Sequence, residues 1–196
     1  LGEHTEIEEV IFSGGDPFLC SDRALGEAVK KVSGLAHVRR VRFHSRVPAT
    51  FPQRVTQQLC DTLEQASLGK PLVLVAHFYH PKEVTQEVAT ALGLLGKSGL
   101  ALLNQSVLLR GVNDDAHTLA ALSKALFELK VLPYYLHHPD RARGTSHFWL
   151  TRTAGLQVYQ ELRKQLPGYL VPRYVVDTVD GEYKRDVEKL PQTFGI

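Results

Sequence analysis

The chain of 196 residues contains no methionine and only two cysteines, Cys20 and Cys60. The two cysteines lie far apart and lack metal-ligand spacing, so we expect no metal ligand among them and interpret them as reduced thiols of a cytoplasmic protein. A complete translated chain begins with methionine, whereas this one begins with Leu1. We therefore expect it to be the remainder of a longer protein.

Long hydrophobic runs and strong charge are also absent. No apolar run reaches the roughly 18 residues of a membrane span, and we identify no signal peptide, so we expect no membrane association. The formal net charge of +2 gives no electrostatic reason to expect nucleic acid as a partner. With 43% hydrophobic and 22% charged residues, the composition is that of an ordinary globular protein with a real core.

What the sequence does contain is an alternation of apolar and amphipathic segments. The apolar segments predict strands over residues 6–12, 38–44, 71–78, 100–109, 131–136 and 171–176. Helical spacing predicts helices over residues 21–32, 53–68, 82–96, 113–129 and 151–166. Such alternation favours an α/β fold with a parallel sheet. Five or six strands are too few to close an eight-stranded barrel, which predicts a partial barrel or one completed by a missing segment.

A polar cluster lies at the C-terminal end of each of the first five predicted strands. These clusters read SGGDP, HSR, HFYHP, NQS and LHHPD along the chain. In parallel α/β sheets, ligands bind at the carboxyl ends of the strands. The sequence therefore predicts one binding site that is built from several of these loops.

Two of the clusters permit specific interpretations. The glycines Gly14 and Gly15 can let a ligand approach bare backbone, and Asp16 can accept a hydrogen bond from an ammonium group, although a Gly-Gly-Asp turn is common. The spacing is not a dinucleotide fingerprint. His77 and His80 form an HxxH pattern, but no carboxylate or cysteine accompanies them at ligand spacing. We expect no metal there and interpret His77 as a hydrogen-bond donor to a ligand hydroxyl.

Charged residues form two further groups. The arginines of the second predicted strand and its loop form a basic patch that we interpret as a solvated strand edge, since no nucleic-acid motif accompanies it. Asp140 and Asp177 both end strands, and two carboxylates in one pocket would suit a substrate ammonium group. Lys184 can form a Schiff base if it lies at the edge of the site, and a surface lysine is the alternative.

Five motifs together resemble a known family. They are SGGDP at 13–17, HSR with FPQR at 44–54, HF-HP at 77–81, NQSVLLRGVND at 104–114 and PYYLHHPDRARGTSHF at 133–148. In this order they resemble the lysine 2,3-aminomutase family of radical S-adenosylmethionine enzymes, which includes the aminomutases that make β-lysine for elongation factor P. The resemblance runs from about Val10 to Asp177, and its last two motifs are long and specific.

The resemblance implies a partial (β/α)6 TIM-like barrel of the radical S-adenosylmethionine type, without its first βα unit in this chain. Residues 1–168 would form the barrel, and 169–196 a C-terminal segment. Enzymes of this family use a [4Fe-4S] cluster to cleave S-adenosylmethionine to a radical. Pyridoxal phosphate holds the nitrogen of the substrate as it migrates from the α to the β carbon. The implied substrate is a small amino acid, lysine or a similar one, and a homo-oligomer is possible.

The resemblance also assigns residues by position. Gly14, Gly15 and Asp16 match the turn that holds the methionyl part of S-adenosylmethionine, and His77 and Gln105 match its other polar contacts. Asp140 and Asp177 match the pair that binds the lysine ammonium group. Lys184 falls where the family has its catalytic, pyridoxal phosphate-binding lysine.

The sequence departs from the family pattern in three respects, one of which is that the family's substrate-carboxylate arginine and its upstream pyridoxal phosphate-binding residues are missing. The CxxxCxxC motif that ligates the cluster is absent, and two lone cysteines cannot replace its three thiolates. We expect it in an upstream portion and expect this chain alone to be inactive. The glycine-rich run before the lysine keeps only Gly181, and Asp180 and Glu182 would be unfavourable beside a phosphate. These changes leave two alternatives: a barrel remnant that only binds a ligand, or a radical enzyme for another amino acid.

Overall fold

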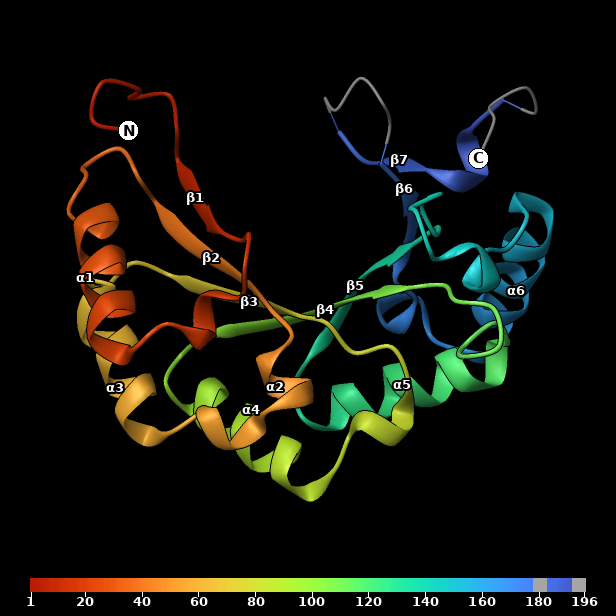
Figure 1. Ribbon diagram of the computed structural model, residues 1–196, viewed down its shortest axis with the longest axis horizontal. Helices are drawn as coiled ribbons and strands as arrows, with labels where there is room; N and C mark the ends of the chain where they lie inside the picture. The colour runs from red at the N-terminus through yellow and green to blue at the C-terminus, as the bar shows by residue number, and fades with distance from the viewer. Residues whose placement is uncertain (178–182, 192–196) are drawn as a thin grey trace. The chain divides into compact units, whose positions relative to one another are not determined.

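The computed structural model describes residues 1–177 and 183–191 (Figure 1). The altered glycine run, with Asp180, Gly181 and Glu182, lies outside the described residues. The strands are β1 (Glu9–Phe12), β2 (Arg40–Ser45), β3 (Leu72–Ala76), β4 (Ala101–Val107), β5 (Leu132–His137), β6 (Arg173–Val176) and β7 (Arg185–Asp186). The helices are α1 (Asp22–Ser33), α2 (Val47–Thr50), α3 (Gln57–Ala66), α4 (Gln86–Lys97), α5 (Ala116–Glu128) and α6 (Arg152–Gln165).

The strands follow one another in the sheet in chain order, from β1 to β7. β1 pairs with β2, β2 with β3, and β5 with β6, each time in parallel. These pairings and the helices between the strands confirm the predicted α/β class. β7 is antiparallel to β6, and Val175 lies opposite Asp186. A strand of two residues has no hydrophobic period, which is why the sequence did not predict it.

The chain divides into two compact units. The first unit comprises residues 1–77, 84–103 and 129–131, and the second comprises 78–83, 104–128 and the chain from 132 onward. β4 begins in the first unit and ends in the second. The boundary predicted near residue 168 stays a prediction. None of the helices in the described part of the chain is long and apolar enough to cross a membrane.

In the first unit, helices cover one face of the strands. α1 and α3 lie side by side (Figure 1). Val41 and Phe43 of β2 are fully buried, whereas Arg42 and His44, which alternate with them, are half-buried. Because side chains alternate between the two faces of a strand, the arginine and the histidine lie on the opposite face from the apolar pair.

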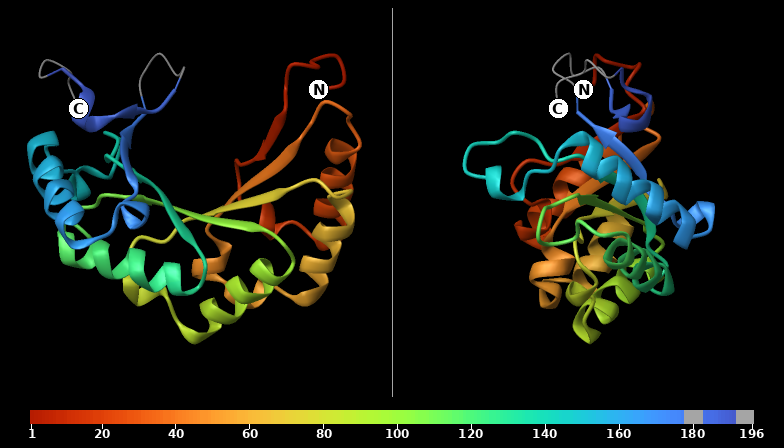
Figure 2. Two further views of the ribbon diagram at one scale, coloured as in Figure 1. Left: turned by 180° about the vertical axis from the view of Figure 1, so that it is seen from behind. Right: turned by 90° about the vertical axis from the view of Figure 1, so that its right-hand side faces the viewer.

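In the second unit, α5 and α6 lie side by side (Figure 2). The core beneath them includes Leu108 directly after β4, Leu136 of β5 and Tyr174 of β6. Gly155 of α6 lies against Tyr174, and a Cβ at this glycine would come within 2.0 Å of the tyrosine hydroxyl oxygen. The absence of a side chain at Gly155 therefore lets α6 pack against the last strand of the core.

Helix starts follow their capping residues. Ser21 and Thr151, the first residues of two predicted helices, accept hydrogen bonds from amides of the first turns of α1 and α6. The helix predicted from residue 53 begins only at Gln57, because the Thr56 hydroxyl accepts from the amide of Leu59 and a 3-10 turn precedes it. The helix predicted from residue 82 begins at Gln86, after Thr85, for the same reason.

Candidate functional site

The predicted site residues belong to both units, and each unit is described by itself. In the first unit, Gly14 and Gly15 form the turn after β1 with φ of +66° and +58°. Residues with a side chain rarely adopt this left-handed conformation. A Cβ at either glycine would meet no other atom within 4 Å. The space beside this backbone is therefore open, as a ligand that approaches the turn would require.

The Asp16 carboxylate ties the loop after β1 to the loop after β2. Its Oδ1 accepts hydrogen bonds from the Ser45 hydroxyl at 2.7 Å and the Phe18 amide at 3.1 Å. Its Oδ2 accepts from the amides of Arg46 at 2.7 Å and Val47 at 3.2 Å. A carboxylate has about four acceptor positions, so these donors nearly exhaust them. Asp16 is thus a structural tie, and its contact with S-adenosylmethionine stays a prediction.

His77 follows β3 and lies against its neighbours on β2. Its carbonyl oxygen accepts a hydrogen bond from Arg46 Nη1 at 2.6 Å, and its ring meets the His44 ring edge-on, with centroids 5.8 Å apart. Burial, and next the positive charge of Arg46, lower the pKa of His77, while Asp16 partly opposes them. The ring is therefore neutral at pH 7 and has one N–H to donate, as the predicted ligand contact requires.

The basic patch of the first unit has a carboxylate partner. Glu9 Oε1 lies 3.4 Å from Arg40 Nε, and Glu9 Oε2 lies 3.1 Å from Arg42 Nη2. The parallel register places Glu9 beside Arg40 and Ile11 beside Arg42. These contacts give two of the arginines a structural explanation within the sheet.

In the second unit, two asparagines of the NQSVLLRGVND motif hold loops in place. Asn104 accepts from the amide of Phe78 at 2.8 Å and donates to its carbonyl at 3.2 Å. Asn113, which is fully buried, donates to the carbonyls of Tyr79 and Val107 and accepts from the Leu109 amide. Much of this motif therefore has a structural role.

Gln105 lies between the buried residues Asn104 and Ser106 on β4 and is itself half-buried. By strand alternation, its side chain is on the opposite face of β4 from theirs. That placement is compatible with the predicted polar contact to a ligand, which stays a prediction.

Asp177 and Lys184 lie together in the second unit. Lys184 Nζ donates to Asp177 Oδ1 at 2.6 Å. The other carboxylate oxygen, Asp177 Oδ2, lies 3.5 Å from His137 Nδ1. Lys184 Nζ also lies 5.8 Å from the centroid of the Tyr135 ring. Tyr135 and His137 of β5, Asp177 directly after β6 and Lys184 directly before β7 thus form one cluster.

Lys184 lines a cavity of about 440 Å³ at the β6–β7 edge. Cationic side chains predominate among the lining residues that the structure describes, and they include Arg173 and Lys189. Asp186 lies between these two cations, with Oδ1 2.7 Å from Arg173 and Oδ2 2.8 Å from Lys189. Both contacts lower the pKa of Asp186, so this carboxylate stays ionised.

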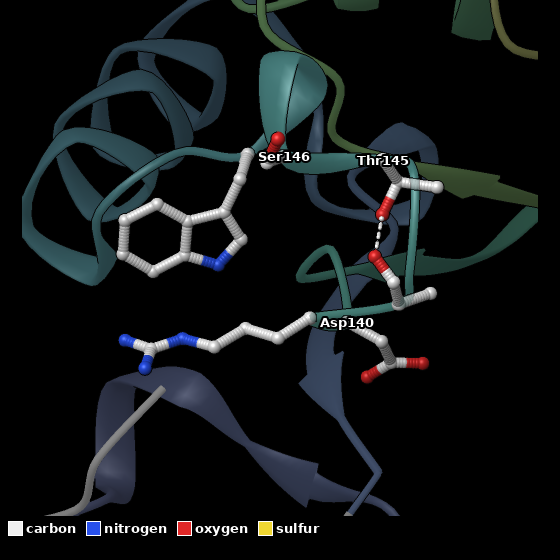
Figure 3. A pocket seen from close by; sticks show the side chains of 6 residues that line it. Asp140, Thr145 and Ser146 are labelled. Atoms are coloured by element: carbon white, nitrogen blue, oxygen red, sulfur yellow. Dashed lines mark hydrogen bonds between the residues drawn. The ribbon is translucent and has the colours of Figure 1, made fainter.

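Asp140 lines a different pocket. This pocket has a volume of about 290 Å³ and lies in the loop after β5, where Thr145 and Ser146 also line it (Figure 3). The guanidinium of Arg141 lies 4.8 Å from the ring centroid of Trp149 in its wall. Among the contacts of the described residues, Asp140 does not join the Asp177–Lys184 pair. A common grip of both aspartates on one ammonium group stays a prediction.

The sequence assigned no role to His137, Tyr135 or Arg173 within the cluster. Tyr135 and His137 are two residues apart on β5, and Tyr135 is in register with Arg173 on β6. Strand alternation after the apolar start of β5 was the signal that places the first two on one face. The register that adds Arg173 could not be read from the sequence.

Two solved structures have a similar fold. A domain of a pyruvate-formate lyase-activating enzyme from Bacteroides vulgatus superposes with a TM-score of 0.57 at 13% identity, covering 86% of this chain and 98% of that one. A radical SAM methyltransferase from Sphaerobacter thermophilus gives a TM-score of 0.56 at 17% identity, over 86% of this chain and 51% of that one. The chain therefore shares the α/β fold of these two proteins, which confirms the predicted fold class.

Sequence similarity then identifies the nearer relatives. The chain is 44% identical over 173 residues to an L-lysine 2,3-aminomutase of Haemophilus influenzae, and 42% identical over 173 residues to one of Escherichia coli. Each match covers 88% of this chain, and the chain spans about half the length of these relatives, 51% and 50%. No protein-family model matches. The chain is thus a homologue of the L-lysine 2,3-aminomutases over most of its own length, which confirms the predicted resemblance.

Proposed function

We propose that this chain is part of a radical S-adenosylmethionine enzyme that moves the amino group of L-lysine, or of a similar amino acid, from the α to the β carbon. The names of the relatives support this reaction, with 44% and 42% identity to two L-lysine 2,3-aminomutases. The observation that carries the proposal within the structure is the Lys184–Asp177 pair, because it places a lysine amine beside a cavity and a carboxylate.

The residues at this cavity fit pyridoxal phosphate. Lys184 Nζ supplies the amine that an aldehyde requires, and 31% of this side chain is exposed, so a ligand in the cavity can reach it. The volume of about 440 Å³ lies within the usual range for small-molecule sites. When bound, this cofactor supplies the carbonyl that carries the amino group of the substrate and a ring that can delocalise electron density.

The chain's own residues would prepare the amine. Lysine attacks a carbonyl as a neutral amine, so a proton must leave Nζ. Asp177 Oδ1 already accepts a hydrogen bond from Nζ at 2.6 Å and is the nearest described group that could take that proton. The Tyr135 ring packs beside Nζ and limits the positions that the long lysine side chain can occupy.

The described residues fit S-adenosylmethionine but not the [4Fe-4S] cluster. The open backbone at Gly14 and Gly15 and the neutral His77 fit a ligand such as S-adenosylmethionine. A [4Fe-4S] cluster does not fit residues 1–177 and 183–191, because they contain no group of three or more His, Cys, Asp or Glu side chains suited to a metal ion. We derive no step through the cluster.

The proposal is tested with the full-length protein, S-adenosylmethionine, a reductant, pyridoxal phosphate and L-lysine. We expect β-lysine among the products, and borohydride reduction of the protein with pyridoxal phosphate should place a pyridoxyl group on Lys184. Lys184→Met should abolish both, whereas Lys31→Met, at an exposed position of α1, should change neither. An active Lys184→Met variant, or wild-type protein that makes no β-lysine, would refute the proposal.

A further inference from the structure

His137 contacts Asp177 through the carboxylate oxygen that Lys184 does not use. The His137 Nδ1 atom lies 3.5 Å from Asp177 Oδ2, whereas Lys184 donates to Oδ1. Only 12% of the His137 side chain is exposed, against 52% of the Asp177 side chain. The nearly buried His137 ring therefore lies against the half-exposed Asp177 carboxylate. A carboxylate with this exposure can rotate unless a neighbouring group holds it.

The backbone around His137 is fixed on both sides. Its carbonyl oxygen accepts a hydrogen bond from the amide of Leu108 after β4, at 2.9 Å. The next residue, His138, donates its amide to the carbonyl of Val175 on β6 at 2.7 Å. The ring itself meets the Tyr135 ring edge-on, with centroids 5.7 Å apart. His137 thus offers a rigid point of reference at the end of β5.

Lys184 has weaker support among the described residues. It lies next to β7, a strand of two residues, and its amine is at the end of a long flexible side chain. Its hydrogen bond to Asp177 at 2.6 Å is the shortest of its described contacts. The orientation of the Asp177 carboxylate therefore determines where the Lys184 amine lies.

We propose that His137 is a positioning residue, whose Nδ1–H holds Asp177 Oδ2 so that Oδ1 stays directed at Lys184. This role rests on the proposed function, in which the Lys184 amine meets a carbonyl cofactor. It requires a donor at the Nδ1 position of the ring and none at Nε2. His137 acts through Asp177 and touches neither cofactor nor substrate.

The two ring nitrogens make a matched test possible. The side-chain nitrogen of Asn lies near the position of Nδ1, whereas that of Gln reaches toward Nε2. We would compare His137→Asn, His137→Gln and His137→Phe in the full-length protein. The first readout is the acetylation of Lys184 by limiting acetic anhydride, measured by mass spectrometry relative to the exposed Lys31. The second is the pyridoxal phosphate concentration that gives half-maximal labelling of Lys184 after borohydride reduction.

We expect the Phe and Gln variants to raise Lys184 acetylation about threefold, because the weakened ion pair leaves the amine more accessible, and to raise the half-labelling concentration about tenfold. The Asn variant should match wild type in both. Urea unfolding should be alike for Asn and Gln, which separates positioning from folding. Equal behaviour of Asn and Gln, or wild-type acetylation in all three, would overturn the role. If acetylation follows the expected order but Lys184 is unlabelled even in wild type, the proposed function fails and the positioning role stands.

Discussion

Asp16 and Asp177 are both aspartates that follow a strand, yet their surroundings differ. Asp16 in the first unit receives four hydrogen bonds, three from backbone amides and one from the Ser45 hydroxyl. Asp177 in the second unit is half-exposed and contacts Lys184 and His137 near an open cavity. An aspartate after a strand can thus have its acceptor positions nearly filled by the fold, as Asp16 does, or stay available to a ligand, as Asp177 does.

The difference shows how a polar residue at a strand end should be interpreted. Acceptor positions that the fold already fills cannot also bind a ligand, so the count of donors decides between a structural and a functional role. The buried contact between His138 Nδ1 and the Tyr174 hydroxyl belongs with Asp16 by this measure, because the two groups are partners within the fold. The following experiments test whether the satisfied groups stabilise the fold and whether the available ones do not.

The largest effect is expected for Asp16→Ala. The change removes an acceptor from four donors, and hydrogen bonds to a charged group contribute about 1.5–3 kcal/mol each, although they are not additive. We expect the free energy of unfolding to fall by about 3–4 kcal/mol, as measured by urea denaturation. Asp140→Ala, at an exposed aspartate, is the matched control and should cost less than about 0.5 kcal/mol. Similar costs for the two variants would remove the distinction between tied and available carboxylates.

The buried pair of the second unit predicts a dependence on pH. His138 is 2% exposed, its Nδ1 lies 2.6 Å from the Tyr174 hydroxyl, and burial, with the charge of Arg152 as a smaller cause, lowers its pKa from 6.5 to about 4. Between these values the unfolded chain binds a proton that the folded chain does not bind. Stability should therefore be full above pH 6.5 and decline as the pH falls toward 4, by about 3 kcal/mol at most.

Urea unfolding at several pH values between 7.5 and 4.5 measures this decline. His138→Asn lacks the titrating ring and should flatten the curve over this range, even if the variant is less stable at pH 7.5. An unchanged slope in the variant would mean that another group causes the decline. The fold would then not depend on a neutral His138 in the His138–Tyr174 pair.

A third test concerns the packing that holds Tyr174 in place. In Gly155→Ala, the new Cβ would come within 2.0 Å of the Tyr174 hydroxyl oxygen, so either α6 or the ring must move. Overpacking of this kind costs about 1–3 kcal/mol, and we expect about 2 kcal/mol from urea denaturation. Gly93→Ala, in α4, meets nothing within 4 Å and should be neutral or stabilising. A neutral Gly155→Ala would show that Tyr174 has space to shift.

The sequence predicted most of the fold because the fold depends on local patterns. Hydrophobic periodicity located β1 to β6, and the helix starts predicted at residues 21 and 151 lie one residue before α1 and α6. Thr56 and Thr85 were missed as caps, since the apolar period extends beyond the hydrogen-bonded helix on its N-terminal side. Local patterns also cannot show how the strands pair across the sheet.

The candidate site was predicted less completely for the same reason. The four donors to Asp16 include residues 29 to 31 positions away, and the sequence gives no measure of their approach. The sequence did not predict the pairing of Lys184 with Asp177 either, although only seven positions separate them. His137 entered the cluster through strand alternation, a signal that is visible in the sequence but does not identify its partner.

The smallest effect on stability is expected for Asp177→Asn, and it completes the comparison with Asp16. The side chains of the pair are 52% and 31% exposed, and exposed ion pairs contribute about 0–1 kcal/mol. We expect urea denaturation to show a change below about 0.5 kcal/mol, while acetylation of Lys184 by limiting acetic anhydride rises at least as much as in His137→Phe, because the lysine loses its carboxylate partner. Asp186→Asn is the control, since it leaves the Lys184–Asp177 hydrogen bond in place and should leave Lys184 acetylation near the wild-type rate. A loss of more than about 1 kcal/mol in Asp177→Asn would make Asp177 a structural tie like Asp16, and a site that depends on its availability would then have to be sought elsewhere in the chain.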